Sequence, residues 1–184
     1  MIGDDDLMQE FVINLKDVQQ AKEGDKEVFE NIMNSLKDQL FHIALAILKN
    51  RQDAEDALQE TYLKAYMNLH KVKQNQFFQT WVTRILINNA KTISKKNTPY
   101  FLQEKIETIY NKQLNDEELF VRDLLDHLQE KERIVIYLRF YGGFEIGSIA
   151  RILRCPESTI KSRLYRGLNR LRRGVDVNEE KHGK

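Results

Sequence analysis

Hydrophobic residues recur at helical spacing along the first half of the chain, as one face of an α-helix requires. The stretch 26–49 shows this period most clearly and predicts a long helix with a plausible end at Asn50. A second helix is expected to start at Asp53, where acidic residues occupy the first turn. After a polar loop, a third helix is expected from Phe77 to about Lys96. We expect these three helices to form one compact unit.

The second half of the chain begins where Asn97-Thr98-Pro99 interrupts the helical pattern, because proline disfavours helix at the residue before it. Residues 98–116 are predominantly polar and predict a linker. Helical patterns resume at 117–129 and 132–141, and Gly142-Gly143 is expected to end the latter. Two further helices are predicted at 145–153 and 156–173, followed by a polar tail that we expect to be frayed.

The composition supports an all-α protein, because the 184 residues include only 2 Pro and 8 Gly. No apolar run reaches the ~18 residues of a membrane span, and the acidic N-terminus lacks a signal pattern. We therefore expect a cytoplasmic location without membrane insertion. Cys155 is the only cysteine, and the four His are scattered without a Ser-His-Asp, metal or phosphate-loop pattern. No catalytic residue, metal, cofactor or small-molecule substrate is predicted, so the chain is not expected to be an enzyme.

The net charge of +1 conceals two basic segments. Residues 81–97 contain four basic residues and no acid, and residues 151–173 contain eight basic residues against Glu157 alone. Acidic residues gather elsewhere, at Asp4–Asp6, from Asp53 to Glu60 and at Asp116–Glu118. This distribution suggests two surfaces that face nucleic acid and other faces with a different purpose.

The sequence IGSIARILRCPESTIKSRLYRGL fits a helix-turn-helix, in which a second helix crosses a short first helix after a tight turn. Ile149 and Leu153 can pack against Ile160 and Leu164. Pro156 suits a first helical turn, which makes Cys155 the expected N-cap and a half-buried turn residue.

The second of these helices is the expected DNA reader, since Lys and Arg reach guanine edges or phosphates and short hydroxyls permit close approach. An ordinary helix with a solvated basic face is the alternative, but the basic excess coincides with the turn. The candidates are Ser158, Thr159, Lys161, Ser162, Arg163 and Arg166.

The segment from Phe77 to Asn97 combines aromatic residues with basic ones and Asn88-Asn89, a combination that single-stranded nucleic acid uses for stacking and charge neutralisation. The aromatic residues Phe77, Phe78 and Trp81 are equally compatible with ordinary core positions. The loop 71–76 could form one wall of a pocket for an extruded base. The acidic helix DAEDALQETYLKAY is either a solvated face or a surface for a protein partner.

The segments DAEDALQETYLKAY, FFQTWVTRILINNAK and FEIGSIARILRCPESTIKSRLYRGLNRLR occur in the order and spacing of bacterial extracytoplasmic-function (ECF) sigma factors. The chain resembles this family over about 20–97 and 117–173. The resemblance implies two small helical domains, sigma domain 2 and sigma domain 4, joined by a flexible linker. It divides the chain into an extension without an assigned role (1–19), domain 2 (20–97), linker (98–116), domain 4 (117–174) and tail (175–184).

The resemblance also implies partners: core RNA polymerase through its β′ clamp and β flap, promoter DNA, and an anti-sigma factor. The acidic helix is similar to the clamp-binding surface, with candidates Asp53, Asp56, Gln59 and Glu60. The region around Trp81 is similar to the reader of the −10 element, with candidates Lys73, Trp81, Arg84, Asn88 and Lys91. The helix after Pro156 is similar to the −35 reader.

The chain departs from the family pattern at two places. The run KTISKKN carries lysines where many members have an Asp and arginines, and Arg154 stands where many have a turn Gly. Two other hypotheses remain at this point, namely a dimeric helix-turn-helix regulator and a helical adaptor that does not bind DNA.

Overall fold

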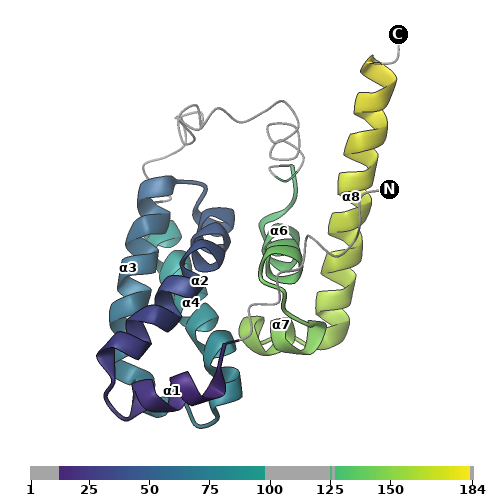
Figure 1. Cartoon of the computed structure of the whole chain (residues 1–184). Helices are drawn as coiled ribbons and strands as arrows, with labels where there is room; N and C mark the ends of the chain where they lie inside the picture. Colours follow the sequence, from purple (N-terminus) through teal and green to yellow (C-terminus); the bar gives the residue numbers. More distant parts are fainter. Residues whose placement is uncertain (1–12, 98–124, 126, 183–184) are drawn as a thin grey trace.

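The computed structural model describes residues 13–97, 125 and 127–182, and over these residues every regular element is helical. The first unit stands on the left of Figure 1. It consists of α1 (Leu15–Lys22), α2 (Lys26–Leu48), α3 (Arg51–Asn68), the 3₁₀ turns η1 (Leu69–Lys71) and η2 (Asn75–Phe77), and α4 (Phe78–Asn97). The predicted all-α fold is confirmed, and the three predicted helices correspond to α2, α3 and α4.

Side-chain caps determine where the long helices start. The Asp25 carboxylate accepts a hydrogen bond of 3.1 Å from the Val28 amide at the beginning of α2. The α2 helix ends at Lys49, whose backbone is left-handed with φ 55°. Asn50, the predicted end of α2, instead caps α3, because its side chain accepts from the Asp53 amide at 3.0 Å. This cap explains why α3 begins at Arg51, two residues before the predicted start.

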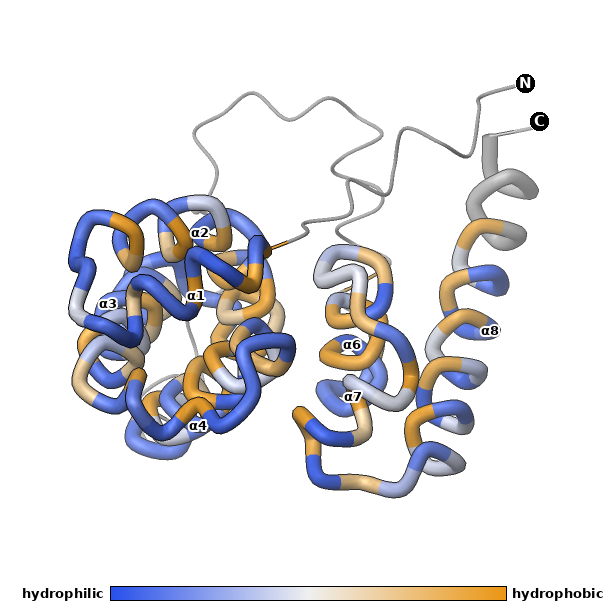
Figure 2. Tube along the Cα trace, turned by 60° about the horizontal axis from the view of Figure 1, so that its bottom comes forward, coloured by the Kyte–Doolittle hydropathy of each residue, from blue (hydrophilic) through white to orange (hydrophobic). Residues whose placement is uncertain are grey.

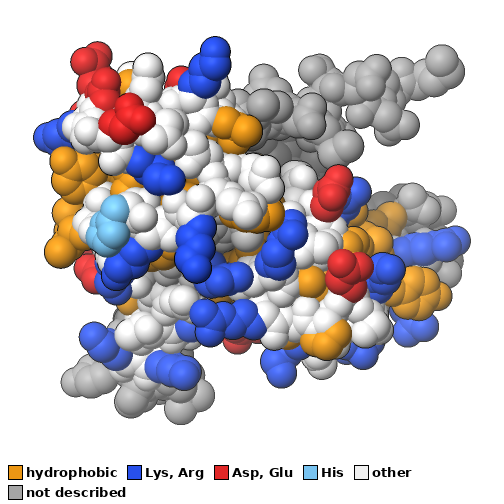
Figure 3. Space-filling view, turned by 90° about the horizontal axis from the view of Figure 1, so that it is seen from below, with side chains coloured by type: hydrophobic (Ala, Val, Ile, Leu, Met, Phe, Trp, Pro, Cys, Tyr) orange, Lys and Arg blue, Asp and Glu red, His pale blue; other side chains and the backbone are white. Residues whose placement is uncertain are grey.

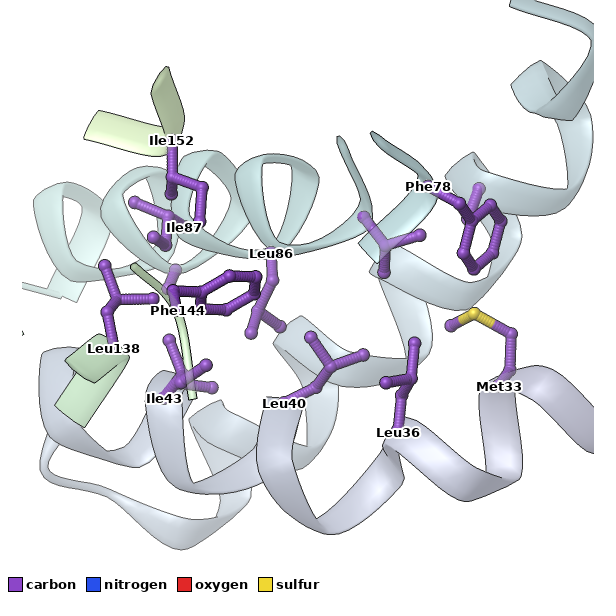
Figure 4. Packing of buried hydrophobic residues seen from close by; sticks show 14 of the residues in the cluster. Met33, Leu36, Leu40, Ile43, Phe78, Leu86, Ile87, Leu138, Phe144 and Ile152 are labelled. Atoms are coloured by element: carbon purple, nitrogen blue, oxygen red, sulfur yellow. The ribbon is translucent and has the colours of Figure 1, made fainter. Parts of the chain in front are cut away.

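The core of the first unit forms between α2 and α4, as Figure 4 shows. Phe29, Leu36, Leu40 and Leu86 are fully buried, and Phe78 is 1% exposed. Burying a side chain of this size contributes about 1.5–3 kcal/mol. These contacts, rather than helix propensity alone, stabilise the bundle.

The first unit also contains a helix within the stretch predicted to be an N-terminal extension. The α1 helix covers Leu15–Lys22, and its Val18 side chain is completely buried. The extension predicted for residues 1–19 therefore includes part of the folded bundle. Residues 1–12 lie outside the described residues.

The second unit consists of α6 (Glu130–Ile136), the π-helical turn η3 (Tyr137–Tyr141), α7 (Ile146–Leu153) and α8 (Glu157–His182). Gly143 follows η3 with φ +65°, which confirms the predicted stop. A Cβ on Gly167 would lie 2.7 Å from Ile136 Cδ1, so glycine allows α8 to pack closely on α6. Hydropathy alternates along α8 in Figure 2, as expected of a helix with one apolar face.

The α8 helix continues to His182, nine residues beyond the predicted end at Arg173. The predicted end was wrong, because the sequence after Gly174 contains no proline or second glycine before Gly183 to stop the helix. The predicted linker 98–116 lies outside the described residues, as does most of the predicted helix 117–129.

The two units pack against each other through apolar side chains. Figure 4 shows Leu138, Phe144 and Ile152 of the second unit beside Ile43 and Ile87 of the first. Polar contacts flank this interface: Arg133 Nε donates to the Ala46 carbonyl at 2.7 Å, and Gln39 Nε2 donates to the Gly142 carbonyl at 2.9 Å. The units thus form one continuous core in this structure.

Candidate nucleic-acid interface

The α7–turn–α8 segment forms the helix-turn-helix that the sequence predicted. The α7 helix ends at Arg154, whose backbone is left-handed with φ 53°. Ile149 and Ile160 are fully buried where the two helices meet. The Pro156 carbonyl accepts from the amides of Thr159 and Ile160, so Pro156 rather than Cys155 occupies the capping position.

The candidate −35 residues on α8 fall into two groups by their surroundings. Ser158, Lys161 and Ser162 are exposed to solvent. The Ser162 hydroxyl donates to the Ser158 carbonyl at 2.8 Å, and its oxygen can still accept a hydrogen bond. Lys and Arg side chains dominate the middle of the face seen from below in Figure 3, the side on which α7 and the start of α8 lie. This surface has the charge that DNA requires.

The remaining −35 candidates have contacts within the protein. Thr159 is half-buried. Arg163 Nη1 lies 3.6 Å from Cys155 Sγ, which holds this guanidinium against the turn. Arg166 is also exposed, with 60% of its side chain accessible, but its Nε lies 3.5 Å from Oε1 of Glu132, whose side chain is 2% exposed. Sequence reasoning had no signal for this ion pair, because its carboxylate lies on another helix, 34 positions earlier in the sequence.

Four of the five −10 candidates share one face of α4. Trp81, Arg84, Asn88 and Lys91 follow one another at intervals of three or four residues, so their side chains align along the helix. Asn88 and Lys91 are exposed, whereas Trp81 and Arg84 are half-buried. Lys73 is exposed in the segment between η1 and η2 and does not belong to this stripe.

Arg84 and the neighbouring Phe77 contact the helix-turn-helix of the second unit. The Arg84 guanidinium donates a hydrogen bond to the Arg151 carbonyl. The Arg151 guanidinium in turn lies over the Phe77 ring, 4.9 Å from its centroid. Burial lowers the pKa of Arg84, and the charge of nearby Arg154 lowers it further. Cationic groups of both units therefore meet where α7 packs against α4.

The aromatic and amide residues beside this stripe are structural. Phe78 lies in the core, which confirms the core alternative for this residue. Asn89 is 5% exposed, donates to Thr61 Oγ1 at 3.0 Å and accepts from Lys64 Nζ at 2.7 Å. Its amide holds α3 and α4 together, and it is not available to read a base edge.

The outer face of α3 carries both acidic and apolar side chains. Asp56, Gln59 and Glu60 are exposed, and Asp53 is half-buried in the first turn. Glu60 forms an exposed ion pair of 3.0 Å with Lys64. The same face exposes the apolar residues Leu63, Tyr66 and Met67, which were not among the predicted site residues.

One of these apolar residues, Leu63, lines a groove between α2 and α3. Met33, Leu58 and Tyr62 are among the residues that line it. Adjacent exposed apolar side chains are typical of protein interaction surfaces. This arrangement favours a protein partner over a merely solvated acidic face.

A basic helix-turn-helix joined to a second helical bundle defines an all-α DNA-binding protein. Two family models match the chain: Sigma-70 region 2 over residues 32–98 and Sigma-70, region 4 over residues 121–171. The chain is 30% identical over 176 residues to the ECF RNA polymerase sigma factor SigW of Bacillus subtilis, covering 86% of this chain and 94% of SigW. It is 29% identical to the ECF sigma-E factor of Haemophilus influenzae, covering 81% and 88%.

The chain belongs to the ECF family of RNA polymerase sigma factors, which confirms the resemblance seen in the sequence. It is a transcription initiation factor that binds core RNA polymerase and directs it to promoters. Its family consists of non-enzymatic initiation factors. This assignment excludes both alternatives, the dimeric regulator and the adaptor that does not bind DNA.

Two solved structures share the fold. CnrH, in complex with the cytosolic domain of CnrY, matches with a TM-score of 0.70 and 20% identity, covering 89% of this chain and 97% of CnrH. The sigma factor RpoE of Bartonella quintana, in complex with the anti-sigma factor NepR, matches with a TM-score of 0.65 and 24% identity, covering 80% and 98%. Among the described residues, no helix has the length and apolar character needed to cross a membrane.

Proposed function

We propose that the first half of α8 reads the −35 element, with Ser158, Lys161 and Ser162 at the DNA surface. The observation that carries this assignment is their shared exposure on the helix that follows the turn, which is the helix that enters the major groove in helix-turn-helix proteins. Lys161 supplies a donor to guanine or phosphate, and the two small hydroxyl residues permit a close approach of the backbone.

Thr159, Arg163 and Arg166 make up the flank of this reading surface. Arg163 and Arg166 each contact a residue of the second unit, which favours one orientation of each guanidinium before DNA binds. We assign the two arginines to phosphate contacts. Such contacts set the register of the protein on the duplex, and they require a positioned charge rather than complementarity to a base.

The −10 element is assigned to the α4 stripe and to the segment before it. Asn88 and Lys91 are exposed and can contact the non-template strand directly, and the half-buried Trp81 offers an aromatic ring for stacking. Arg84 donates one hydrogen bond to the Arg151 carbonyl, which leaves other N–H groups of its half-buried guanidinium for a phosphate. Lys73, in the segment before α4, contributes positive charge on the other side of the non-template DNA strand.

The outer face of α3 is assigned to core RNA polymerase. Asp56, Gln59 and Glu60 supply hydrogen-bond acceptors to a basic partner helix, and Leu63 and Met67 supply apolar area beside them. Asp53 lies at the N-terminal end of the same helix. This combination fits the β′ clamp, while the β flap is assigned to the second unit.

An anti-sigma factor is also proposed as a partner. The solved RpoE neighbour is a sigma factor in complex with the anti-sigma factor NepR, and CnrH was likewise solved in complex with another chain, the cytosolic domain of CnrY. To test for a stable inhibitory complex, a tagged copy of this chain is expressed and purified, and the proteins that co-purify with it are identified by mass spectrometry. Full transcription activity of every complex recovered would contradict the proposal.

The −35 assignment is tested in a reconstituted holoenzyme with a promoter library randomised at the −35 element. Lys161→Ala should lower transcription about tenfold and relax the base preference at one or two positions, since a good base contact is worth about 1–3 kcal/mol. The matched control is Arg172→Ala, an exposed basic residue farther along α8. If both variants behave alike, the effect is general charge and the assignment of a reading face fails.

A further inference from the structure

We infer that α1 is a brace for the segment that leads into α4, and that Asn75 is the positioning residue through which it acts. This inference rests on the proposed role of Lys73, Trp81 and the α4 stripe in −10 recognition. Neither α1 nor its contact with Asn75 follows from the region 2 match, which begins at residue 32.

The α1 helix has a fixed position in the first unit. The Asn14 side chain caps its start by accepting from the Lys16 amide at 3.0 Å. Val18 and Ala21 anchor one face in the core, with exposed fractions of 0% and 5%. At its end, Gly24 turns the chain with φ +110° directly into the cap of α2. A helix anchored in this way can hold another segment in place.

The side-chain amide of Asn75 forms hydrogen bonds to one side of α1 through both its nitrogen and its oxygen. Its Nδ2 donates to the Leu15 carbonyl at 3.2 Å and to Gln19 Oε1 at 3.1 Å. Its Oδ1 accepts from Lys22 Nζ at 3.2 Å. Leu15, Gln19 and Lys22 succeed each other at intervals of four and three residues, so they lie on one side of α1. The half-buried Asn75 thereby satisfies three of its four hydrogen-bonding positions.

The braced segment lies between two buried anchors, Val72 at 3% exposure and Phe78 at 1%. Between them, the side chains of Lys73, Gln74 and Gln76 are exposed. The direction in which these side chains point depends on the turn η2, which begins at Asn75. In this turn the Phe77 amide donates to the Gln74 carbonyl at 3.0 Å. The hydrogen bonds to α1 fix that turn relative to the α4 stripe, so α1 sets −10 selectivity without touching DNA.

The test is made in the reconstituted holoenzyme with a promoter library randomised at the −10 element. Asn75→Ala should reduce the preference between bases at the affected −10 positions by roughly fivefold to tenfold, the effect expected from losing hydrogen bonds of ordinary strength. Gln19→Ala, which removes a contact from the α1 side, should reduce it in the same direction. The double variant should show less than the product of the two effects, because both changes break one contact. The preference at the −35 element and the affinity for core polymerase should not change.

A second measurement does not depend on transcription. Amide hydrogen exchange at Phe77 should accelerate several-fold in Gln19→Ala, because η2 opens more often without the brace. Gln20→Ala, an exposed change on another side of α1, is the matched control and should leave exchange unaltered.

Three outcomes would overturn the inference. If Asn75→Ala alters −10 preference while Gln19→Ala does not alter it, Asn75 reads DNA directly. If neither variant alters preference or exchange, α1 is not a brace. If Asn88→Ala and Lys91→Ala also leave −10 preference intact, the proposed −10 surface itself is wrong, and the inference falls with it.

Discussion

The side-chain amide of Gln39 in α2 donates a buried hydrogen bond of 2.9 Å to the main-chain carbonyl of Gly142, 103 residues farther along the chain. The same side chain accepts from Gln79 Nε2 in α4 at 2.8 Å. One glutamine, 4% exposed, therefore joins α2 and α4 of the first unit to the end of η3 in the second. The packing of the two units depends on polar contacts as well as on the apolar core.

Replacing this residue should separate the units. Gln39→Met keeps the length of the side chain but removes both hydrogen bonds, which should lower the free energy of unfolding by about 1–2 kcal/mol. Small-angle X-ray scattering should show a larger radius of gyration. Gln79→Met is the control, because it removes the bond within the first unit and leaves the bond to Gly142. Equal radii for the two variants would contradict the prediction.

Arg154 combines a left-handed backbone with a nearby like charge. Its φ is 53°, a conformation that costs a non-glycine residue about 1–2 kcal/mol, and its charge lowers the pKa of Arg84. Arg154→Gly should therefore raise the midpoint of thermal unfolding by a few degrees. Arg154→Gln removes the charge but keeps the strain, so its midpoint should lie between those of the wild type and Arg154→Gly. A midpoint for Arg154→Gly below that of the wild type would refute this explanation.

Glu132 holds two arginines of α8 from a buried position. Its oxygens lie 3.5 Å from Arg166 Nε and 3.4 Å from Arg170 Nη1. Glu132→Gln leaves the shape of the side chain but removes its charge, and it should destabilise the second unit by about 1–3 kcal/mol. Denaturant unfolding followed by circular dichroism measures this loss. The exposed Glu130→Gln serves as the control and should lose less; an equal loss would show that the ion pair contributes nothing.

His42 should make the stability of the fold sensitive to pH. Its ring centroid lies 4.6 Å from that of Tyr141 in the second unit. Burial lowers the pKa of His42 below its ordinary 6.5, although the carboxylate of Asp38 opposes the shift. Below pH 6.5 the unfolded chain then binds more protons than the folded one, so stability falls as the pH drops from 6.5 toward the lower folded pKa.

The measurement is the midpoint of thermal unfolding as a function of pH. His42→Phe should abolish the fall of the midpoint between pH 6.5 and the lower folded pKa, since phenylalanine cannot take up a proton. The same replacement at the exposed His70 should leave the slope in place. If the slope is unchanged in His42→Phe, groups other than His42 cause the loss of stability at acidic pH.

Much of the fold was predictable from the sequence because helix formation is a local property. The period of apolar residues located α2, α3 and α4, and Gly142-Gly143 marked the end of η3. The helix-turn-helix was predictable because Ile149 and Ile160 belong to neighbouring segments whose packing follows from a short turn. Helix ends were predicted less well where a side-chain cap at Asn50 or the lack of a stop after Gly174 decided them.

The sequence by itself determined the class of protein, the long helices α2, α3 and α4, and the set of residues that could face DNA. Only the tertiary structure decided which of these residues are exposed and which have partners within the protein. Arg166 pairs with Glu132, Asn89 with Thr61, and Arg84 with the carbonyl of Arg151. The partners lie between 28 and 67 positions apart in the sequence. Such pairings depend on how the helices pack, because no periodicity within a single helix specifies which distant side chain will lie beside it.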